Sequence, residues 1–149
     1  MKEVRDKEGR TIGYDLKLSP EAFGAEVREH LVQLQNIYGL FSAELDDVAY
    51  ELNVIKLDLE EAEALVNDYI EDYISKMPLQ RKNIKKPNKL NIEVNLRDGR
   101  KTTVLKIKSD LIDIKKLHDN CDSKLKELDR AINTSRSLLA WDRMEYGNS

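Results

Sequence analysis

Apolar residues recur at steps of three and four from Leu31 to Tyr73, and this pattern constrains the fold more than any other feature of the chain. None of these positions carries a charged residue. The members of the stripe are Leu31, Leu34, Tyr38, Phe41, Leu45, Val48, Leu52, Ile55, Leu59, Ala62, Val66, Tyr69 and Tyr73. Such spacing predicts one long amphipathic helix.

The ends of this helix are marked by local signals. Ser19-Pro20-Glu21 is typical of a helix start, and Pro78 ends the helix, so we expect it to span residues 19–77. A heptad stripe rotates by about 20° per heptad on a straight helix. We therefore expect supercoiling against a partner or a break that resets the phase, and Gly39 is the expected break.

A second helix is predicted over residues 109–149, where the same heptad steps return. Its expected inward residues are Leu111, Ile114, His118, Cys121, Leu125, Leu128, Ile132, Ser135 and Leu139. Leu117 and Leu138 are expected to widen this inward face. Polar residues in such a seam more often fix the register or the oligomeric state than bind a ligand.

Two short segments indicate β-hairpins, one before each helix. In residues 78–108, Leu90, Ile92, Val94 and Leu96 alternate with polar residues and lead to Asp98-Gly99, a hairpin signal that follows a basic loop. We expect the return strand at Lys101–Ile107, although the helix can instead start at Thr102 or Thr103. Residues 1–18 carry a similar Gly-Arg-Thr sequence and predict an N-terminal hairpin.

The predicted fold is therefore mainly α. It consists of two long heptad-patterned helices that form an antiparallel helical hairpin or coiled coil, with a small β-hairpin before each helix, in one domain of 149 residues.

Charge is strongly segregated along the chain, although the net charge is only -3. Residues 20–75 hold two basic and fourteen acidic groups, whereas residues 76–108 hold eleven basic and two acidic groups. The basic segment can neutralise phosphates, face the acidic helix of a neighbouring subunit, or be a solvated loop. Its candidate nucleic-acid-binding residues are Lys76, Arg81, Lys82, Lys85, Lys86, Lys89, Arg97, Arg100, Lys101 and Lys106.

Self-association is expected because one helical hairpin cannot bury both faces of its stripes. The candidate oligomer interface is formed by Leu45, Val48, Leu52, Ile55, Leu59, Leu125, Leu128, Ile132, Leu139 and Trp141. Trp141 suits a subunit interface or a platform on which bases stack.

No set of residues indicates a reaction. One Cys and two His exclude a disulfide framework and the usual zinc sites, and His118 and Cys121 are better explained by burial in the seam. We therefore expect no catalytic residues, no metal and no cofactor, hence no enzyme. No apolar stretch reaches the roughly 18 residues of a membrane span, and Met1-Lys-Glu-Val-Arg-Asp lacks the apolar core of a signal peptide, so a cytoplasmic protein is expected.

The pattern resembles the UvsY-like recombination mediators of bacteriophages. The resemblance is carried by Lys101-Thr-Thr-Val-Leu-Lys-Ile-Lys, by Asp110-Leu-Ile-Asp-Ile-Lys-Lys-Leu, and by the C-terminal segment from Leu125 to Gly147. It implies an oligomeric accessory protein of a bacterial host's cytoplasm that binds single-stranded DNA and assists a recombinase or a single-strand-binding protein. The β-hairpins depart from that pattern and look more like a prefoldin-type holdase, which is the alternative function, as is a structural coiled coil that binds no nucleic acid.

Overall fold

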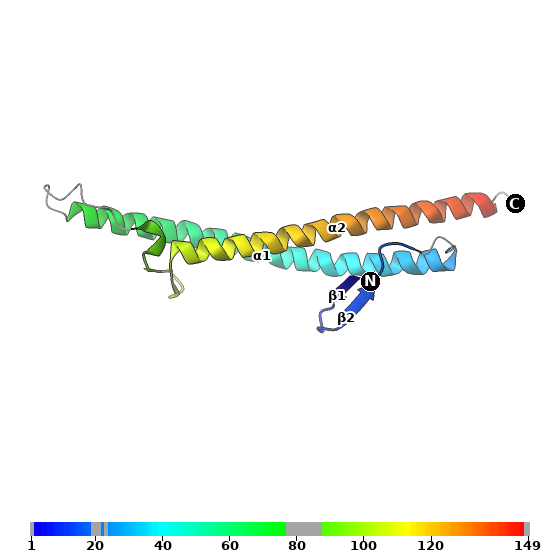
Figure 1. Ribbon diagram of the computed structural model, residues 1–149, viewed down its shortest axis with the longest axis horizontal. Helices are drawn as coiled ribbons and strands as arrows, with labels where there is room; N and C mark the ends of the chain where they lie inside the picture. The colour runs from blue at the N-terminus through cyan, green and yellow to red at the C-terminus, as the bar shows by residue number, and fades with distance from the viewer. Residues whose placement is uncertain (1, 19–21, 23, 77–87, 148–149) are drawn as a thin grey trace. The chain divides into compact units, whose positions relative to one another are not determined.

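The computed structural model describes residues 2–18, 22, 24–76 and 88–147, with side chains as far as Trp141. Two long helices pack against each other as an antiparallel hairpin, and a two-stranded antiparallel sheet precedes each helix (Figure 1). The order of elements is β1 (Lys2–Arg5), β2 (Thr11–Tyr14), α1 (Ala25–Ser75), β3 (Val94–Asn95), β4 (Lys101–Thr102) and α2 (Val104–Gly147). The prediction of a mainly α helical hairpin with small β-hairpins is confirmed.

The chain divides into two compact units, each built from parts of both helices. Unit 1 comprises Met1–Asp47 and His118–Ser149, and unit 2 comprises Val48–Leu117. Each unit has its own hydrophobic cluster and its own β-hairpin.

The core of unit 1 joins the first half of α1, the second half of α2 and the first hairpin. Its buried members are Val4, Tyr14, Leu34, Ile37, Phe41, Cys121, Leu125, Leu128 and Ile132. In the hairpin Val4 lies opposite Ile12, and the Lys2 ammonium lies 2.7 Å from the Glu127 carboxylate on α2. Apolar burial and this surface ion pair hold the hairpin on the helices.

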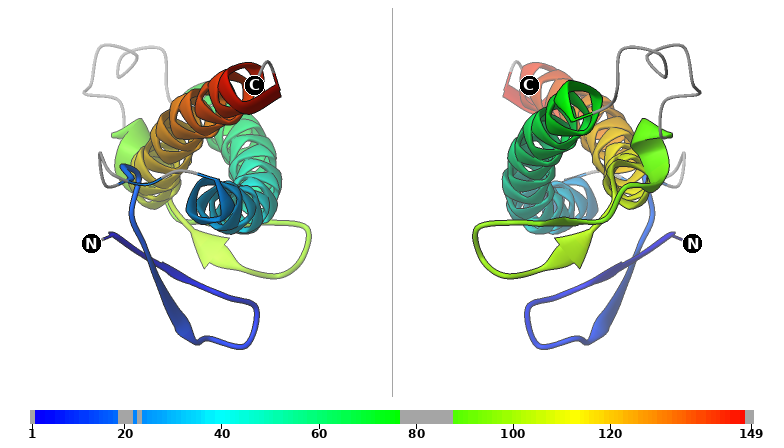
Figure 2. Two further views of the ribbon diagram at one scale, coloured as in Figure 1. Left: turned by 90° about the vertical axis from the view of Figure 1, so that its right-hand side faces the viewer. Right: turned by 90° about the vertical axis from the view of Figure 1, so that its left-hand side faces the viewer.

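The core of unit 2 joins the second half of α1, the start of α2 and the second hairpin. Its buried members are Ala62, Val66, Ile70, Val94, Leu96, Val104 and Ile107. Figure 2 shows this hairpin lying beside the helices. Before β3, Lys89–Asn91 form a 3₁₀ turn, and the Asn88 side chain accepts a hydrogen bond from the Leu90 N–H. The expected strand from Leu90 to Leu96 is thus reduced to two residues, although Val94 and Leu96 point inward as predicted.

Helix α1 is continuous through Gly39, so of the two alternatives, supercoiling or a break, a break at Gly39 does not occur. No break is needed, because the inward positions of α1 follow the ordinary helical period instead of a strict heptad. Neighbouring inward positions are four residues apart at least twice in succession around Phe41 and again after Ala62. From Val27 to Ile74 the inward positions therefore advance by about 3.6 residues per step, the period of an ordinary α-helix.

Because the inward positions recur every 3.6 residues and not every 3.5, three tyrosines of the predicted stripe lie outside the core. Ile37 is buried where Tyr38 was expected, and Ile70 and Ile74 turn inward in place of Tyr69 and Tyr73. On α2 the alternating steps of three and four hold, with Cys121 and Ser135 buried and His118 half-buried. Leu117 and Leu138 are exposed and do not widen its buried face.

Helix α2 begins at Val104, five residues before the predicted start at Ser109, so the return strand does not extend to Ile107. The Thr103 hydroxyl accepts a hydrogen bond from the Lys106 N–H at 3.1 Å, as expected of an N-cap. Val104 and Ile107, one helical turn apart, are both buried in the core of unit 2. The alternative prediction, a helix start at Thr102 or Thr103, is therefore nearer to the observed start than the prediction of Ser109.

Helix α1 begins at Ala25, later than the start predicted at residues 19–21, which lie outside the described residues. Ala22 lies outside the helix, and Gly24 has φ +60°. A left-handed residue cannot continue a right-handed helix, so the helix starts after Gly24. The predicted end at Pro78 also lies outside the described residues.

The two hairpins share one turn geometry, which supports the internal similarity seen in the sequence. In the first, Gly9 N–H donates to the Asp6 carbonyl at 3.1 Å and Asp6 N–H donates to the Arg10 carbonyl at 2.9 Å. In the second hairpin, the Gly99 N–H donates to the Leu96 carbonyl and the Leu96 N–H donates to the Arg100 carbonyl, both at 2.9 Å. Both glycines have positive φ, +82° and +89°, which explains why glycine occupies this position.

Candidate nucleic-acid interface

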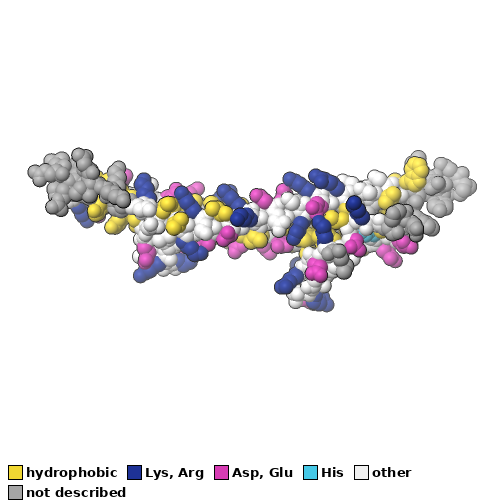
Figure 3. Space-filling model, in the orientation of Figure 1, with side chains coloured by type: hydrophobic (Ala, Val, Ile, Leu, Met, Phe, Trp, Pro, Cys, Tyr) yellow, Lys and Arg dark blue, Asp and Glu magenta, His cyan; other side chains and the backbone are white. Residues whose placement is uncertain are grey.

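The described Lys and Arg residues of the basic segment lie in unit 2, and all of them are exposed. Of the ten predicted binding residues, the structure places Lys76, Lys89, Arg97, Arg100, Lys101 and Lys106. Arg81, Lys82, Lys85 and Lys86 lie outside the described residues. Along the face drawn in Figure 3, Lys and Arg side chains lie among Asp and Glu side chains. The segregation of charge along the sequence therefore does not produce a purely basic face there.

The turn of the β3–β4 hairpin is fixed by its own aspartate. The Asp98 Oδ1 atom accepts a hydrogen bond from the Arg100 N–H at 3.1 Å, and this bond lowers the pKa of Asp98. The Arg100 guanidinium also binds the other oxygen of the same carboxylate. The turn is therefore ordered before any ligand is bound.

Two contacts clamp this turn onto α1. The Arg100 Nη2 atom lies 2.9 Å from the Asp58 carboxylate, and the Arg97 N–H donates to Glu61 Oε1 at 2.8 Å. The hydrogen bonds from Arg100 to Asp58 and Asp98 raise the pKa of its guanidinium. Part of the basic segment thus meets the acidic helix of its own chain, a possibility that the sequence reading placed between subunits.

Three of the described cations of the basic segment neutralise carboxylates of this chain. Besides Arg100, Lys106 lies 2.7 Å from Asp110 on α2, and Lys76 lies 2.9 Å from Asp72 on α1. The hydrogen bond with Asp110 raises the pKa of Lys106. The Lys76–Asp72 and Lys106–Asp110 pairs are exposed on both sides, so each of them can open to another anion at small cost, whereas the Asp58 side chain is only 16% exposed.

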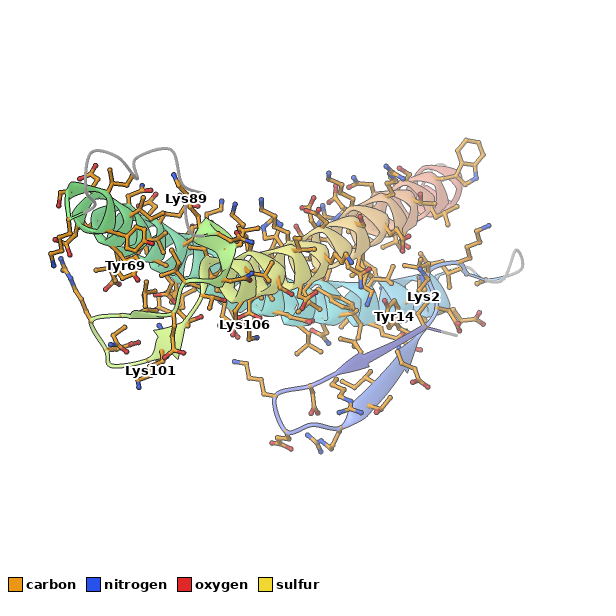
Figure 4. All side chains as sticks on the ribbon, turned by 60° about the vertical axis from the view of Figure 1, so that its left-hand side comes forward. Lys2, Tyr14, Tyr69, Lys89, Lys101 and Lys106 are labelled. Carbon is orange, nitrogen blue, oxygen red and sulfur yellow. The ribbon has the colours of Figure 1, made fainter. Side chains whose placement is uncertain are left out.

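Four other cations have no carboxylate within ion-pairing distance among the described residues: Lys89, Arg97, Lys101 and Lys108. They do not lie together. Lys89 and Lys101 project from opposite sides of the unit in Figure 4. Lys89 and Lys108 line a cavity of about 310 Å³ with Asn67, while Lys101, Arg100 and Lys106 line another of about 330 Å³. The structure therefore brings Arg100, Lys101 and Lys106 to one cavity beside the hairpin, places Arg97 in the hairpin turn, and puts Lys89 at a different cavity.

Most residues of the predicted oligomer interface belong to the interior of the single chain. Val48, Leu125, Leu128 and Ile132 are buried, and Leu45, Leu52, Ile55, Leu59 and Leu139 are half-buried. The four buried side chains have no further apolar surface to bury against a partner, and the five half-buried ones have little. Trp141, 64% exposed, is the one exposed member of the set.

Exposed apolar residues that the sequence analysis did not select lie on the outer faces of unit 2. They are Tyr50 and Leu57 on α1, and Leu105 and Ile112 on α2, each pair seven residues apart. Spacing of seven places both members of a pair on one face, so this signal was available from the sequence. A stacked pair, Tyr69 and Tyr73, was assigned to the core stripe and is instead exposed.

The His118 and Cys121 side chains do not form a nucleophilic pair. The Cys121 thiol donates to the Phe41 carbonyl oxygen at 3.2 Å, and burial raises its pKa. His118 lies 3.5 Å from Asp119. Within residues 2–18, 22, 24–76 and 88–147, no group of three or more His, Cys, Asp and Glu side chains is arranged to hold a metal ion. The helices among these residues include none that is long and apolar enough to cross a membrane.

Comparisons of the chain with models of protein families, with curated proteins and with solved structures find no match.

Proposed function

We propose that this chain is a non-enzymatic protein that binds single-stranded nucleic acid through the β3–β4 hairpin. The observation that carries the proposal is the pair Arg97 and Lys101. Arg97 lies in one ordered turn and Lys101 follows it, both residues are exposed, and neither side chain has a carboxylate partner among the described residues. Two such cations held at fixed positions on a rigid turn suit successive phosphates of a nucleic-acid backbone.

Arg100 and Lys106 extend this interface. Lys106 is paired with the more exposed Asp110 carboxylate, which a phosphate can replace, whereas Arg100 can meet a phosphate with its 57% exposed side chain while it keeps Asp58. Recognition of the backbone predicts little base preference from these four residues and a steep decline of affinity with salt. The UvsY-like resemblance supports a role for the bound complex in assisting a recombinase or a single-strand-binding protein.

The test is fluorescence anisotropy of a labelled single-stranded oligonucleotide, and of its duplex, at about 50 and 200 mM salt, a range over which phosphate-driven affinity changes strongly. The variant Arg97→Glu/Lys101→Glu should weaken binding and lower the slope of log affinity against log salt by about 0.7 for each lost phosphate contact. Lys115→Glu/Lys116→Glu is the matched control, because it makes the same change of charge at exposed lysines of α2 in the same unit. An equal loss in both variants would assign binding to net charge and exclude the hairpin.

Assembly is a second candidate function, supported by the exposed Tyr50, Leu57, Leu105 and Ile112. Large apolar side chains aligned on two outer helix faces are typical of contact with further helices. A structural coiled-coil protein or a prefoldin-like holdase would use these faces. Light scattering of the native chain and of Leu57→Lys/Ile112→Lys tests it: a mass above that of the monomer that falls in the variant supports assembly, and a monomeric native chain excludes it.

A further inference from the structure

We infer that Tyr69 and Tyr73 form a platform on which bases of a single strand stack, an inference that rests on the proposed function. The two rings lie with centroids 6.4 Å apart and planes inclined by 15°. Their residues are 52% and 39% exposed. An aromatic face open to water, next to a cationic surface, is the element by which proteins hold unpaired bases.

The exposure of the two rings follows from the helical period of α1. Ile70 and Ile74 take the inward positions at this end of the helix. Successive residues point about 100° apart around a helix axis, so Tyr69 and Tyr73 are directed to the side of the core. Their spacing of four aligns them on one face, where their rings stack on each other.

The tyrosine pair lies on the flank of α1 to which the hairpin is clamped. On this flank Asp58 binds Arg100, and Glu61 binds the Arg97 N–H. Glu61 is followed at steps of four by Leu65 and Tyr69. Tyr69 therefore lies about 12 Å along the helix from Glu61, at 1.5 Å per residue. This distance corresponds to three or four stacked nucleotides at about 3.4 Å each. Figure 4 shows Tyr69 on α1 and Lys101 on the hairpin.

Three acidic groups along this flank are already engaged, whereas Asp68, seven residues after Glu61, has no ion-pair partner among the described residues. Asp58 is paired with Arg100, Glu61 accepts the Arg97 N–H, and Asp72 is paired with Lys76 beyond the tyrosines. Asp68 is adjacent to Tyr69 in sequence and therefore points about 100° away from it. A phosphate backbone that enters at Arg97 and Lys101 meets cations at both ends of the tyrosine pair.

The ligand is an unpaired base, which identifies the strand type. Bases of a duplex are already stacked and paired, so their faces are not available to the tyrosines. The platform therefore favours a single strand over a duplex, whereas cations alone attract both. It contributes affinity that salt does not weaken, because stacking releases no counterions.

The experiment compares a labelled oligothymidine with an abasic oligonucleotide of the same length, which has the same phosphates and no bases. We expect the native chain to bind oligothymidine more tightly. In Tyr69→Ala/Tyr73→Ala, affinity for oligothymidine should fall by about tenfold or more, as loss of base stacking predicts. Affinity for the abasic strand and the salt slope should not change. Tyr69→Phe/Tyr73→Phe keeps both rings and should bind as the native chain does.

Tyr50→Ala is the control for loss of an exposed tyrosine ring, since Tyr50 is 73% exposed on α1 in the same unit and lies about 28 Å along the helix from Tyr69. Equal binding of both strands by the native chain, or an alanine variant that binds oligothymidine normally, overturns the platform and leaves backbone binding intact. If the native chain binds neither strand, the proposed function fails and the platform fails with it. Circular dichroism of each variant verifies that helicity is kept.

Discussion

The guanidinium of Arg100, in the turn of the second hairpin, lies 2.9 Å from the carboxylate of Asp58 on α1. The two residues are 42 positions apart in sequence. Only 16% of the Asp58 side chain is exposed, whereas 57% of the Arg100 side chain is. A shielded carboxylate gains more from a cation than an exposed one does, so this pair determines where the hairpin lies on α1.

The first prediction concerns this pair. In a double-mutant cycle with Arg100→Ala and Asp58→Ala, urea denaturation should show a favourable coupling. The cycle for Lys76 and Asp72, both largely exposed, should show a smaller one. Arg100→Ala should also speed hydrogen exchange of the Leu96 N–H, which closes the turn. Equal coupling in the two cycles would contradict the anchoring role of Asp58.

A second prediction compares two glycines. Gly99 has φ +89°, and a Cβ atom there would meet no neighbour within 4 Å, so Gly99→Ala loses stability through backbone strain alone, by about 1–2 kcal/mol. Gly39 is exposed within α1, and Gly39→Ala should gain roughly 1 kcal/mol. Thermal and urea unfolding measure both changes. A loss at Gly39 would show that the helix deviates locally there.

The third prediction concerns His30, which is 9% exposed on the inward face of α1. Its Nε2 atom is buried without a hydrogen-bond partner among the described residues. Because an unsatisfied buried polar group costs about 1–3 kcal/mol, His30→Leu should stabilise the chain by about 1 kcal/mol or more. The half-buried His118 is the control, and His118→Leu should change stability by less than about 0.5 kcal/mol. Destabilisation by His30→Leu would indicate that the imidazole has a partner.

Acid should weaken the two turns specifically. Hydrogen bonds from the backbone N–H groups of Arg10 and Arg100 lower the pKa values of Asp6 and Asp98 in the folded chain. A lowered folded pKa contributes stability above the unfolded value of about 4, and this contribution is lost as the pH falls through the folded value. Asp6→Asn/Asp98→Asn should therefore lose less stability than the native chain between about pH 5 and pH 2. Parallel pH profiles would contradict this assignment.

The fifth prediction concerns the reactivity of Cys121, which is 4% exposed and whose pKa is raised by burial. A raised pKa leaves less thiolate near neutral pH, and burial hinders access. Modification by a disulfide reagent at pH 8 should be at least about tenfold slower in the native chain than in urea. Ser123→Cys places a second thiol at an exposed position two residues away and should react rapidly. Rapid native reaction of Cys121 would indicate local opening of unit 1.

Local signals were sufficient for much of the fold. The Asp98-Gly99 turn and the buried residues Leu125, Leu128 and Ile132 follow from spacing and turn chemistry within a few residues of each position. The start of α2 was placed too late because Val104 and Ile107 fit a strand and a helix equally well by sequence. Their packing on α1 decides for the helix, and that contact is not visible locally.

The sequence predicts which basic residues belong to the candidate site, but it does not predict which of them share a surface or are free of carboxylate partners. Arg97 and Lys101 are distinguished from Arg100 only by the contact between Arg100 and Asp58, which joins positions far apart in sequence. The tyrosines were assigned to the core because a strict heptad passes through Tyr69 and Tyr73. A small change of period, from 3.5 to about 3.6 residues, puts Ile70 and Ile74 there instead.

The division of the chain into a continuous and a discontinuous unit implies an order of folding. Unit 2 is one uninterrupted stretch, Val48–Leu117, whereas unit 1 needs both ends of the chain. Closing the shorter loop costs less entropy, so the inner stretch is expected to acquire protection first during refolding. Pulse-labelled hydrogen exchange should then protect the amides of Val66 and Ile107 before those of Leu34 and Leu128. During synthesis, the first hairpin would wait for its partner helix until the residues from Cys121 to Ile132 had left the ribosome.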